Sequence, residues 1–193
     1  SGTGLADVTA DEVWQSWQAR LSGLGYEVTG SAERDGDRLV IRDLGLSRSY
    51  PDDGGRAELR IGRIAFEDRD DGRVSVIYPE TMPMAVAVMP EEGEAVTATL
   101  TLRHDALSVI ASGTPDRIGY AYDAATLRLE IGDVTVDGAP MEGLTGRMRF
   151  EDVSGTRESA VAADIRRSTQ SLVSGAMSYA FSAEPPEGNG RVR

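Results

Sequence analysis

The stretch RLVIRDLGL, residues 38–46, alternates apolar and polar side chains, then skips one residue and resumes the alternation in the opposite phase. The pattern returns in ELRIGRIAF at residues 58–66 and in RLEIGDVTV at residues 128–136. Alternation with a period of two predicts a β-strand with one buried face. A β-bulge at the skip, which inserts one extra residue, keeps both apolar pairs on that face. Because bulges bend strands, the three copies predict a strongly curved sheet, although bulges also occur in ordinary β-sandwiches.

Two glycines, Gly62 and Gly132, occupy the skip in the second and third copies. Glycine adopts positive φ without steric cost, so we expect positive φ at both positions. The residues between the apolar positions of the copies are mostly charged or small. A sheet with one polar and one apolar face has to fold over on itself, meet a second sheet or hold a ligand.

After Gly25 the chain consists mainly of short alternating segments, separated by turn signals such as Asp53-Gly54, Asp71-Gly72 and Asp137-Gly138. No long helical pattern separates them, which argues against parallel βαβ crossovers. We therefore predict a mainly β fold: one strongly curved, bulged antiparallel meander sheet, as a half-barrel or folded-over sheet, with one N-terminal amphipathic helix. The expected strands span residues 38–46, 57–67, 73–78, 84–89, 95–103, 106–112, 117–123, 126–136, 144–152, 158–165 and 171–182.

The helix is predicted near the start of the chain. Thr9 and Glu12 have the spacing of a capping box, in which each side chain accepts a hydrogen bond from a backbone N–H of the first turn. Gly25 is expected to end the helix. An apolar stripe runs along it at spacings of three and four, which predicts that Trp14 and Trp17 are buried against the sheet, although the pair could also hold a ligand. The stripe comprises Val13, Trp14, Trp17, Leu21 and Leu24.

Composition excludes several classes of function. The net charge of −12 repels a phosphate backbone, so we expect no nucleic-acid partner. The chain contains no apolar run long enough to cross a bilayer, so it is not expected to span a membrane. It contains no cysteine, which excludes disulfides and thiolate metal sites. We expect residues 1–8 to be leader or expression residues, residues 9–183 a single β-rich domain, and residues 184–193 a disordered tail.

The sequence holds no recognisable catalytic constellation. His104 is the only histidine, and its neighbour Asp105 would point to the opposite face of a strand, so His104 is expected at a surface or strand end. The turn at residues 68–72, DRDDG, is similar to a calcium loop, but glycine stands where the fifth position needs an oxygen ligand. A hairpin turn is the favoured interpretation. We therefore expect no enzyme activity, no metal and no cofactor.

Several short phrases together resemble a bacterial envelope family known as domain of unknown function 2125. They are ADVTADEVW at residues 6–14, LGY at 24–26, GDRLVI at 36–41, ASGTPD at 111–116 and DVTVDG at 133–138. The resemblance covers most of residues 6–182. It implies an exported, periplasmic protein from which a signal peptide has been removed, and one usually longer than this chain. The bulged phrases are also similar to those of envelope proteins whose long curved sheets carry lipids, which is an analogy between folds.

Two functions follow as expectations. The first is a non-enzymatic envelope domain that binds a lipid or other amphiphile on the apolar concave face of the sheet. The second is a scaffold or interaction domain with a closed core and no small-molecule ligand, which meets an envelope protein partner. A continuous cavity beneath the sheet would favour the first. The ligand-binding residues expected for the first function are Trp14, Trp17, Ile61, Phe66, Ile131 and Val136.

Overall fold

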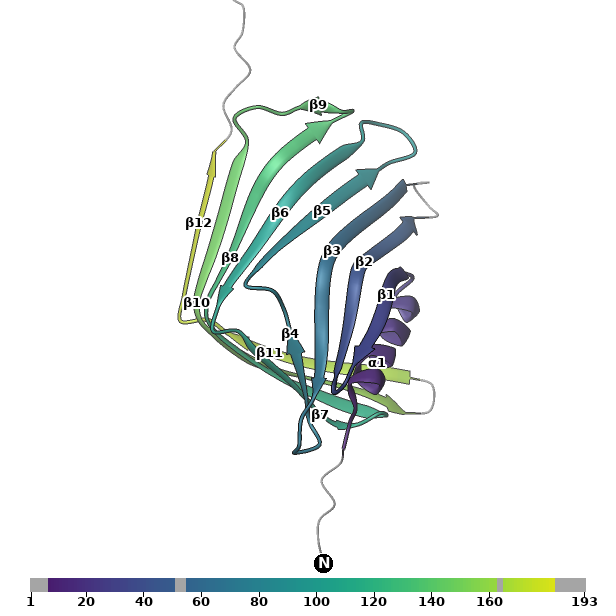
Figure 1. Cartoon of the computed structure of the whole chain (residues 1–193). Coiled ribbons are helices and arrows are strands. Elements are labelled where there is room, and N and C mark those ends of the chain that lie inside the picture. Colours follow the sequence, from purple (N-terminus) through teal and green to yellow (C-terminus); the bar gives the residue numbers. More distant parts are fainter. Residues whose placement is uncertain (1–6, 51–54, 163–164, 183–193) are drawn as a thin grey trace, which may run out of the picture.

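The computed structural model describes residues 7–50, 55–162 and 165–182. One N-terminal helix packs against one antiparallel sheet, which confirms the predicted mainly β fold (Figure 1). The elements are α1 (Ala10–Gly23), β1 (Glu27–Asp35), β2 (Arg38–Tyr50), β3 (Gly55–Asp68), β4 (Val74–Ile77), β5 (Thr81–Met89), β6 (Val96–Asp105), β7 (Ser108–Thr114), β8 (Arg117–Val136), β9 (Ala139–Pro140), β10 (Thr145–Ala162), β11 (Ile165–Val173) and β12 (Ala176–Ser182).

Three long strands change partner along their length. β3 pairs with β5 and then with β4. β8 pairs with β7 and then with β6, and β10 pairs with β12 and then with β11. The sheet therefore divides into two arms that share these strands. The β6 arm contains β5, β6, β9, β12 and the halves of the long strands paired with them. The β7 arm contains β4, β7, β11 and the other halves.

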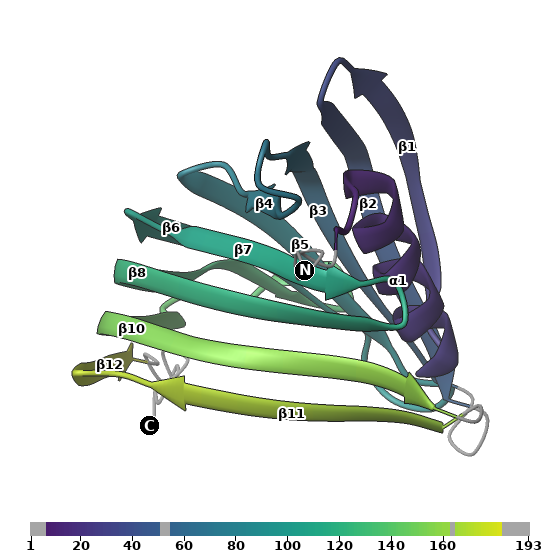
Figure 2. The same cartoon turned by 90° about the horizontal axis from the view of Figure 1, so that it is seen from below.

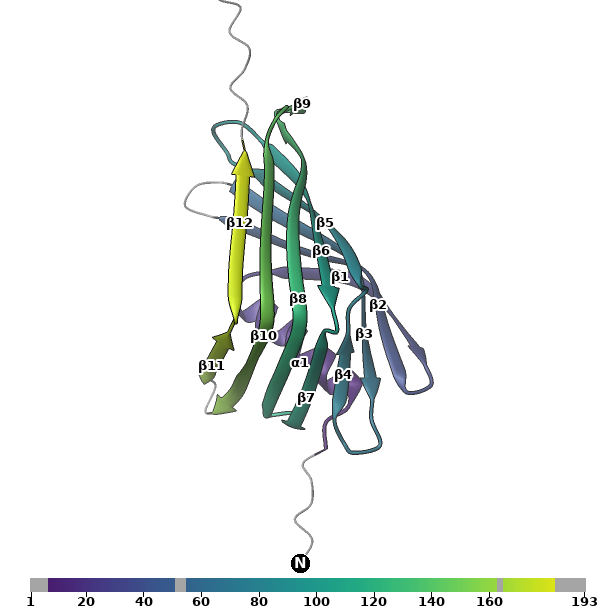
Figure 3. The same cartoon turned by 90° about the vertical axis from the view of Figure 1, so that its left-hand side faces the viewer.

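The two arms run in different directions. In Figure 1 the strands of the β6 arm stand upright, whereas β7 and β11 cross the lower part of the view. Figure 3 shows β12, β10, β8 and β6 side by side in the β6 arm. Asp152 has φ 48° and lies where β10 passes from one arm to the other. This left-handed residue bends the strand, and aspartate tolerates the conformation better than most side chains.

Bulges are present in the first and third copies of the repeated phrase, as predicted. In the β1–β2 ladder Thr29 pairs with Gly45 and Ser31 with Arg42, so β2 contains one extra residue at the skip. In the β6–β8 ladder the extra residue lies in β8, between Ile131 and Val134. The prediction of a bulge at Gly62 in the second copy is wrong, because the β2–β3 ladder shows no register shift there. The skip of this copy instead coincides with the place where β3 exchanges β5 for β4.

The prediction of positive φ at Gly62 and Gly132 is wrong, because neither glycine has a left-handed backbone. The left-handed residue of the first copy is Asp43, with φ 51°. At Gly132 a different restriction applies. A Cβ there would lie 2.4 Å from Oγ1 of Thr99, so any other residue would have to displace this side chain of β6.

Some strand boundaries differ from those expected. β1 was not predicted, since its sequence EVTGSAERD is almost entirely polar and its side chains are mostly exposed. The two segments expected at 117–123 and 126–136 form the single strand β8. The segment expected at 171–182 covers the end of β11 and all of β12, with Ser174 and Gly175 between the two strands. Residues 1–6 of the predicted leader and the predicted tail at 184–193 lie outside the described residues, whereas Val8 is buried and its N–H donates to the carbonyl of Gly72.

The core lies between α1 and the sheet. The capping box of Thr9 and Glu12 is present as predicted. Trp14 is 8% exposed and Phe66 of β3 is fully buried, and their ring centroids lie 5.9 Å apart. The N–H of Ala10 donates to Oδ1 of Asp68 at 2.6 Å, which joins the first turn of the helix to the end of β3. Figure 2 shows α1 in the angle between β1 and β2 and the ends of β7, β8, β10 and β11.

Candidate functional site

The β6 arm presents one continuous apolar face. Paired residues in neighbouring strands point to the same side of a sheet, so the register defines rows of side chains that cross the arm. One row contains Ile61, Met84, Leu100, Ile131 and, beyond Gly146, Phe181. The next row contains Met82, Leu102, Leu129, Met148 and Tyr179.

This face is open at its β12 end. Met177, Tyr179 and Phe181 are 62%, 70% and 57% exposed. β12 pairs with β10 alone among the described strands. A contiguous exposed apolar patch on a protein surface is typical of an interaction or ligand-binding surface.

A cavity of about 360 Å³ lies where this face meets α1 and the β7 arm, and we call it the helix pocket. Its apolar wall is formed by Leu102 of β6, Leu107 before β7, Val109 of β7 and Leu127 of β8. The volume falls within the range usual for small-molecule sites. The sheet therefore leaves a lined hollow beside the helix and does not pack shut there.

Trp17 closes the helix side of the pocket. Its indole Nε1–H donates to the Tyr120 hydroxyl at 3.0 Å. Its ring stands edge-on against Phe66, with centroids 5.2 Å apart and the planes at 86°. Trp17 is only half-buried, because its other edge lines the helix pocket.

The opposite wall carries the polar side chains of the pocket. The Tyr122 hydroxyl donates to the carbonyl of Ser171 at 2.9 Å, so its ring reaches across β10 towards β11. Gly155 makes this possible, because a Cβ at that position would lie 2.7 Å from Cε2 of Tyr122. Gln170 and Arg157 line the pocket beside this ring. Nε of Arg157 donates to Oγ of Ser168 at 3.3 Å.

His104 and Tyr78 meet at the junction of the arms. Nε2 of His104 lies 3.2 Å from the carbonyl oxygen of Tyr78. Nδ1 of His104 is buried and has no hydrogen-bond partner among the described residues. Burial raises the pKa of the Tyr78 hydroxyl above its ordinary value, and the nearby Tyr120 acts in the same direction. Among the described residues, neither ring nitrogen of His104 has a hydrogen bond to a side chain.

We expect the stability of the fold to decrease at alkaline pH because of Tyr78. Its folded pKa is raised above the unfolded value of about 10, so the folded state keeps its proton while the unfolded state releases it. The stabilisation is therefore present below pH 10 and is lost as pH rises through the folded pKa. Urea unfolding at pH 8 to 11 measures this decrease. Tyr78→Phe should flatten the decrease, and an equally steep decrease in that variant would contradict the assignment.

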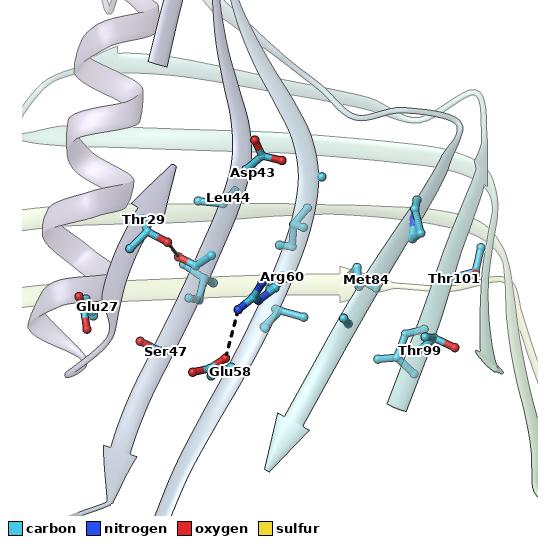
Figure 4. Close-up of a pocket in the computed structure, with 18 of the residues that line it drawn as sticks. Glu27, Thr29, Asp43, Leu44, Ser47, Glu58, Arg60, Met84, Thr99 and Thr101 are labelled. Carbon is cyan, nitrogen blue, oxygen red and sulfur yellow. Dashed lines mark hydrogen bonds and ion pairs between the residues drawn. The ribbon is translucent and has the colours of Figure 1, made fainter. Parts of the chain in front are cut away.

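A second hollow, of about 710 Å³, lies on the polar face of β2, β3, β5 and β6 (Figure 4). Its polar side chains alternate along each strand with those packed against the core, so they point away from α1. Three of its charged side chains pair with one another: Glu58 contacts Nε of Arg56 at 2.8 Å and Nη2 of Arg60 at 3.8 Å. Thr29 donates to the carbonyl of Gly45 at 3.5 Å. Glu27 and Asp43 also line this hollow, which is therefore more acidic than the helix pocket in its described residues.

The predicted ligand-binding residues do not form one site. Trp14 and Phe66 pack against each other inside the closed helix–sheet core. Trp17 alone lines the helix pocket. The remaining three lie on the β6 arm outside that pocket, where they are half-buried: Ile61, Ile131 and Val136.

Sequence reasoning missed the tyrosines and the arginine of the pocket. Tyr120 and Tyr122 alternate in phase with the buried Ile118 and Ala124 of β8, which is a signal that could have placed them on the inner face. Arg157 had no such signal, since its neighbours in the chain are polar.

The turn at residues 68–72 is a hairpin turn between β3 and β4, as predicted. The N–H of Gly72 donates to the carbonyl of Arg69, and Gly72 has φ 73°. The hydrogen bond from the Arg73 side chain lowers the pKa of Asp71 to about 2. Within the described residues, histidines and carboxylates form no group of three that could hold a metal ion.

The described part of the chain has no helix of the length and apolar character needed to cross a membrane. Comparison of the chain with family models, with curated proteins and with solved structures gives no match, so the resemblance to the envelope family stays a prediction.

Proposed function

We propose that the protein is a non-enzymatic domain that binds a lipid or other amphiphile, with the hydrocarbon portion held in the helix pocket and on the apolar face of the β6 arm. The observation that carries the proposal is the continuity of the apolar rows from exposed β12 into the lined pocket. Burying apolar surface contributes roughly 25 cal/mol per Å², so a long hydrocarbon chain gains affinity along the whole face.

The same face argues against the alternative prediction of a closed scaffold domain. A scaffold with a packed core would cover its apolar residues, whereas Tyr179 and Phe181 lie in the open. Export to the periplasm is included in the proposal only because the sequence resembles the envelope family. In that setting the domain would carry or present a lipid without spanning the membrane.

A fluorescent fatty acid titrated into the purified protein tests the proposal. We expect saturable binding, and native mass spectrometry should show a co-purifying hydrophobic mass. Leu127→Asp places a carboxylate in the apolar wall and should weaken binding at least about tenfold, because an unpaired charge in an apolar site is costly.

The matched control is Ala121→Asp, which adds the same charge to β8 at an exposed position and should leave binding unchanged. Circular dichroism confirms that both variants are folded. Absence of saturable binding and of any co-purifying mass in the unmodified protein would show that the proposal is wrong, whatever the variants do.

A further inference from the structure

We infer that the helix pocket selects amphiphiles with an anionic head group, a carboxylate or a phosphate, which Arg157 binds. This inference rests on the proposed function, because it concerns the class of ligand held at the same site. Its starting point is the charge of the pocket lining. Arg20 and Arg157 line it, and no aspartate or glutamate does so among the described residues.

That lining is unusual for this chain. The sequence contains 32 acidic and 20 basic residues, so its surface carries an excess of carboxylates. The described lining of the hollow thus places the guanidinium group of Arg157 where no described carboxylate lines the wall, on a protein with an excess of acidic residues. An anion entering it gains favourable interactions there and is repelled by the remaining surface.

Arg157 is the residue of the pocket whose guanidinium group can bind an anion. It lies in β10, paired with Tyr120 on one side and with Gln170 on the other, and it is half-buried. Its described side-chain contact is the neutral hydroxyl of Ser168, and it has no acidic partner in the described chain. The next residue, Glu158, points to the opposite face and pairs with Arg117 at 2.8 Å. A guanidinium without a carboxylate can bind an incoming carboxylate or phosphate through two parallel hydrogen bonds.

The polar and apolar groups of the pocket are separated as an amphiphile requires. Arg157 and Gln170 come from β10 and β11, and the hydroxyl of Tyr122 lies beside Gln170, whose Nε2 is 3.4 Å from it. The apolar wall comes from β6, β7 and β8. A bound molecule would therefore place its head group against β10 and β11 and its hydrocarbon chain against Leu102 and Leu127.

The test uses twelve-carbon ligands that differ only in the head group. Dodecanoate, dodecyl phosphate, dodecanol and dodecyltrimethylammonium are compared, below their micelle concentrations, in displacing the neutral dye Nile red from the whole protein. We expect at least one of the two anions to bind about tenfold or more tighter than dodecanol, with the preference shrinking in high salt. Tight binding of dodecanoate assigns a fatty-acid type of ligand, and tight binding of dodecyl phosphate alone assigns a phosphate head group.

Arg157→Gln should remove the preference for the anion and leave the affinity for dodecanol unchanged, whereas Arg157→Lys should keep part of the preference. The control is Arg103→Gln, which removes an exposed arginine that pairs with Glu130 outside the pocket and should change neither affinity. Equal binding of dodecanoate, dodecyl phosphate and dodecanol, or a preference for the cation, would overturn the inference and leave the proposed function standing. Failure of all four ligands to displace the dye would overturn the proposed function itself.

Discussion

Trp14→Ala is expected to lower the free energy of unfolding by about 3–5 kcal/mol, the range for truncating a large buried aromatic side chain. Trp14 is 8% exposed and packs on the fully buried Phe66, so its removal leaves a cavity at the centre of the helix–sheet core. Alanine favours the helix more than tryptophan does, so the loss comes from packing and not from helix propensity. Urea unfolding followed by circular dichroism measures the change.

Leu24→Ala is the matched control for this measurement. Leu24 follows the last turn of the same helix and is 51% exposed, so its truncation should cost less than about 1 kcal/mol. Similar unfolding midpoints for the two variants would mean that α1 does not contribute its tryptophan to the core.

Gly155→Ala is expected to destabilise the fold by about 1–3 kcal/mol through overpacking. The new methyl group would lie 2.3 Å from the carbonyl oxygen of Ser171 and 2.7 Å from the ring of Tyr122, so the ring has to leave its place across β10. Since Tyr122 and Gln170 line the helix pocket, binding of the fluorescent fatty acid should weaken in the same variant. Unfolding and titration of one preparation check both effects.

Gly119→Ala is expected to have the opposite effect on the stability of the fold. Gly119 lies in β8, where an added Cβ meets its nearest neighbours at 3.9–4.0 Å, an ordinary contact. Alanine there reduces the freedom of the unfolded chain, so the fold should be unchanged or stabilised by about 0.4–1 kcal/mol. If both substitutions stabilise, the close approach of Tyr122 to Gly155 is not present in solution.

The sequence predicts the parts of the fold that depend on local patterns. The capping box of Thr9 and Glu12 and the bulges of the first and third copies follow from side-chain type and spacing. The division of the sheet into two arms does not follow from such local patterns. From the sequence, β8 and β10 each read as two separate strands and β3 as one bulged strand. The residue at which a strand exchanges one partner for another depends on neighbours distant in the chain. Asp43 also shows that a skip does not require glycine for a left-handed backbone.

The candidate site was less predictable for a related reason. The apolar residues of the repeated phrase indicated the inner face of the sheet, but that face is divided between the core under α1 and the open β6 arm. Phe66 is fully buried in the core, whereas Ile61, five residues earlier in the same phrase, packs against the edge of that core and continues the apolar row of the β6 arm. Arg157, the residue on which head-group selection depends, is one of 20 arginines and becomes distinctive only when β10 places it opposite Tyr120.

The hydrogen bond between Trp17 and Tyr120 joins residues 103 positions apart, which has a consequence for the order of folding. Chains grow from the N-terminus, so α1 leaves the ribosome long before the strand that completes its packing. Contacts between residues so distant in sequence form slowly, because the chain has to lose much of its freedom before they stabilise it. During synthesis α1 can therefore pack on β2 and β3 first, whereas the edge of Trp17 that meets Tyr120 stays uncovered until β8 has been made.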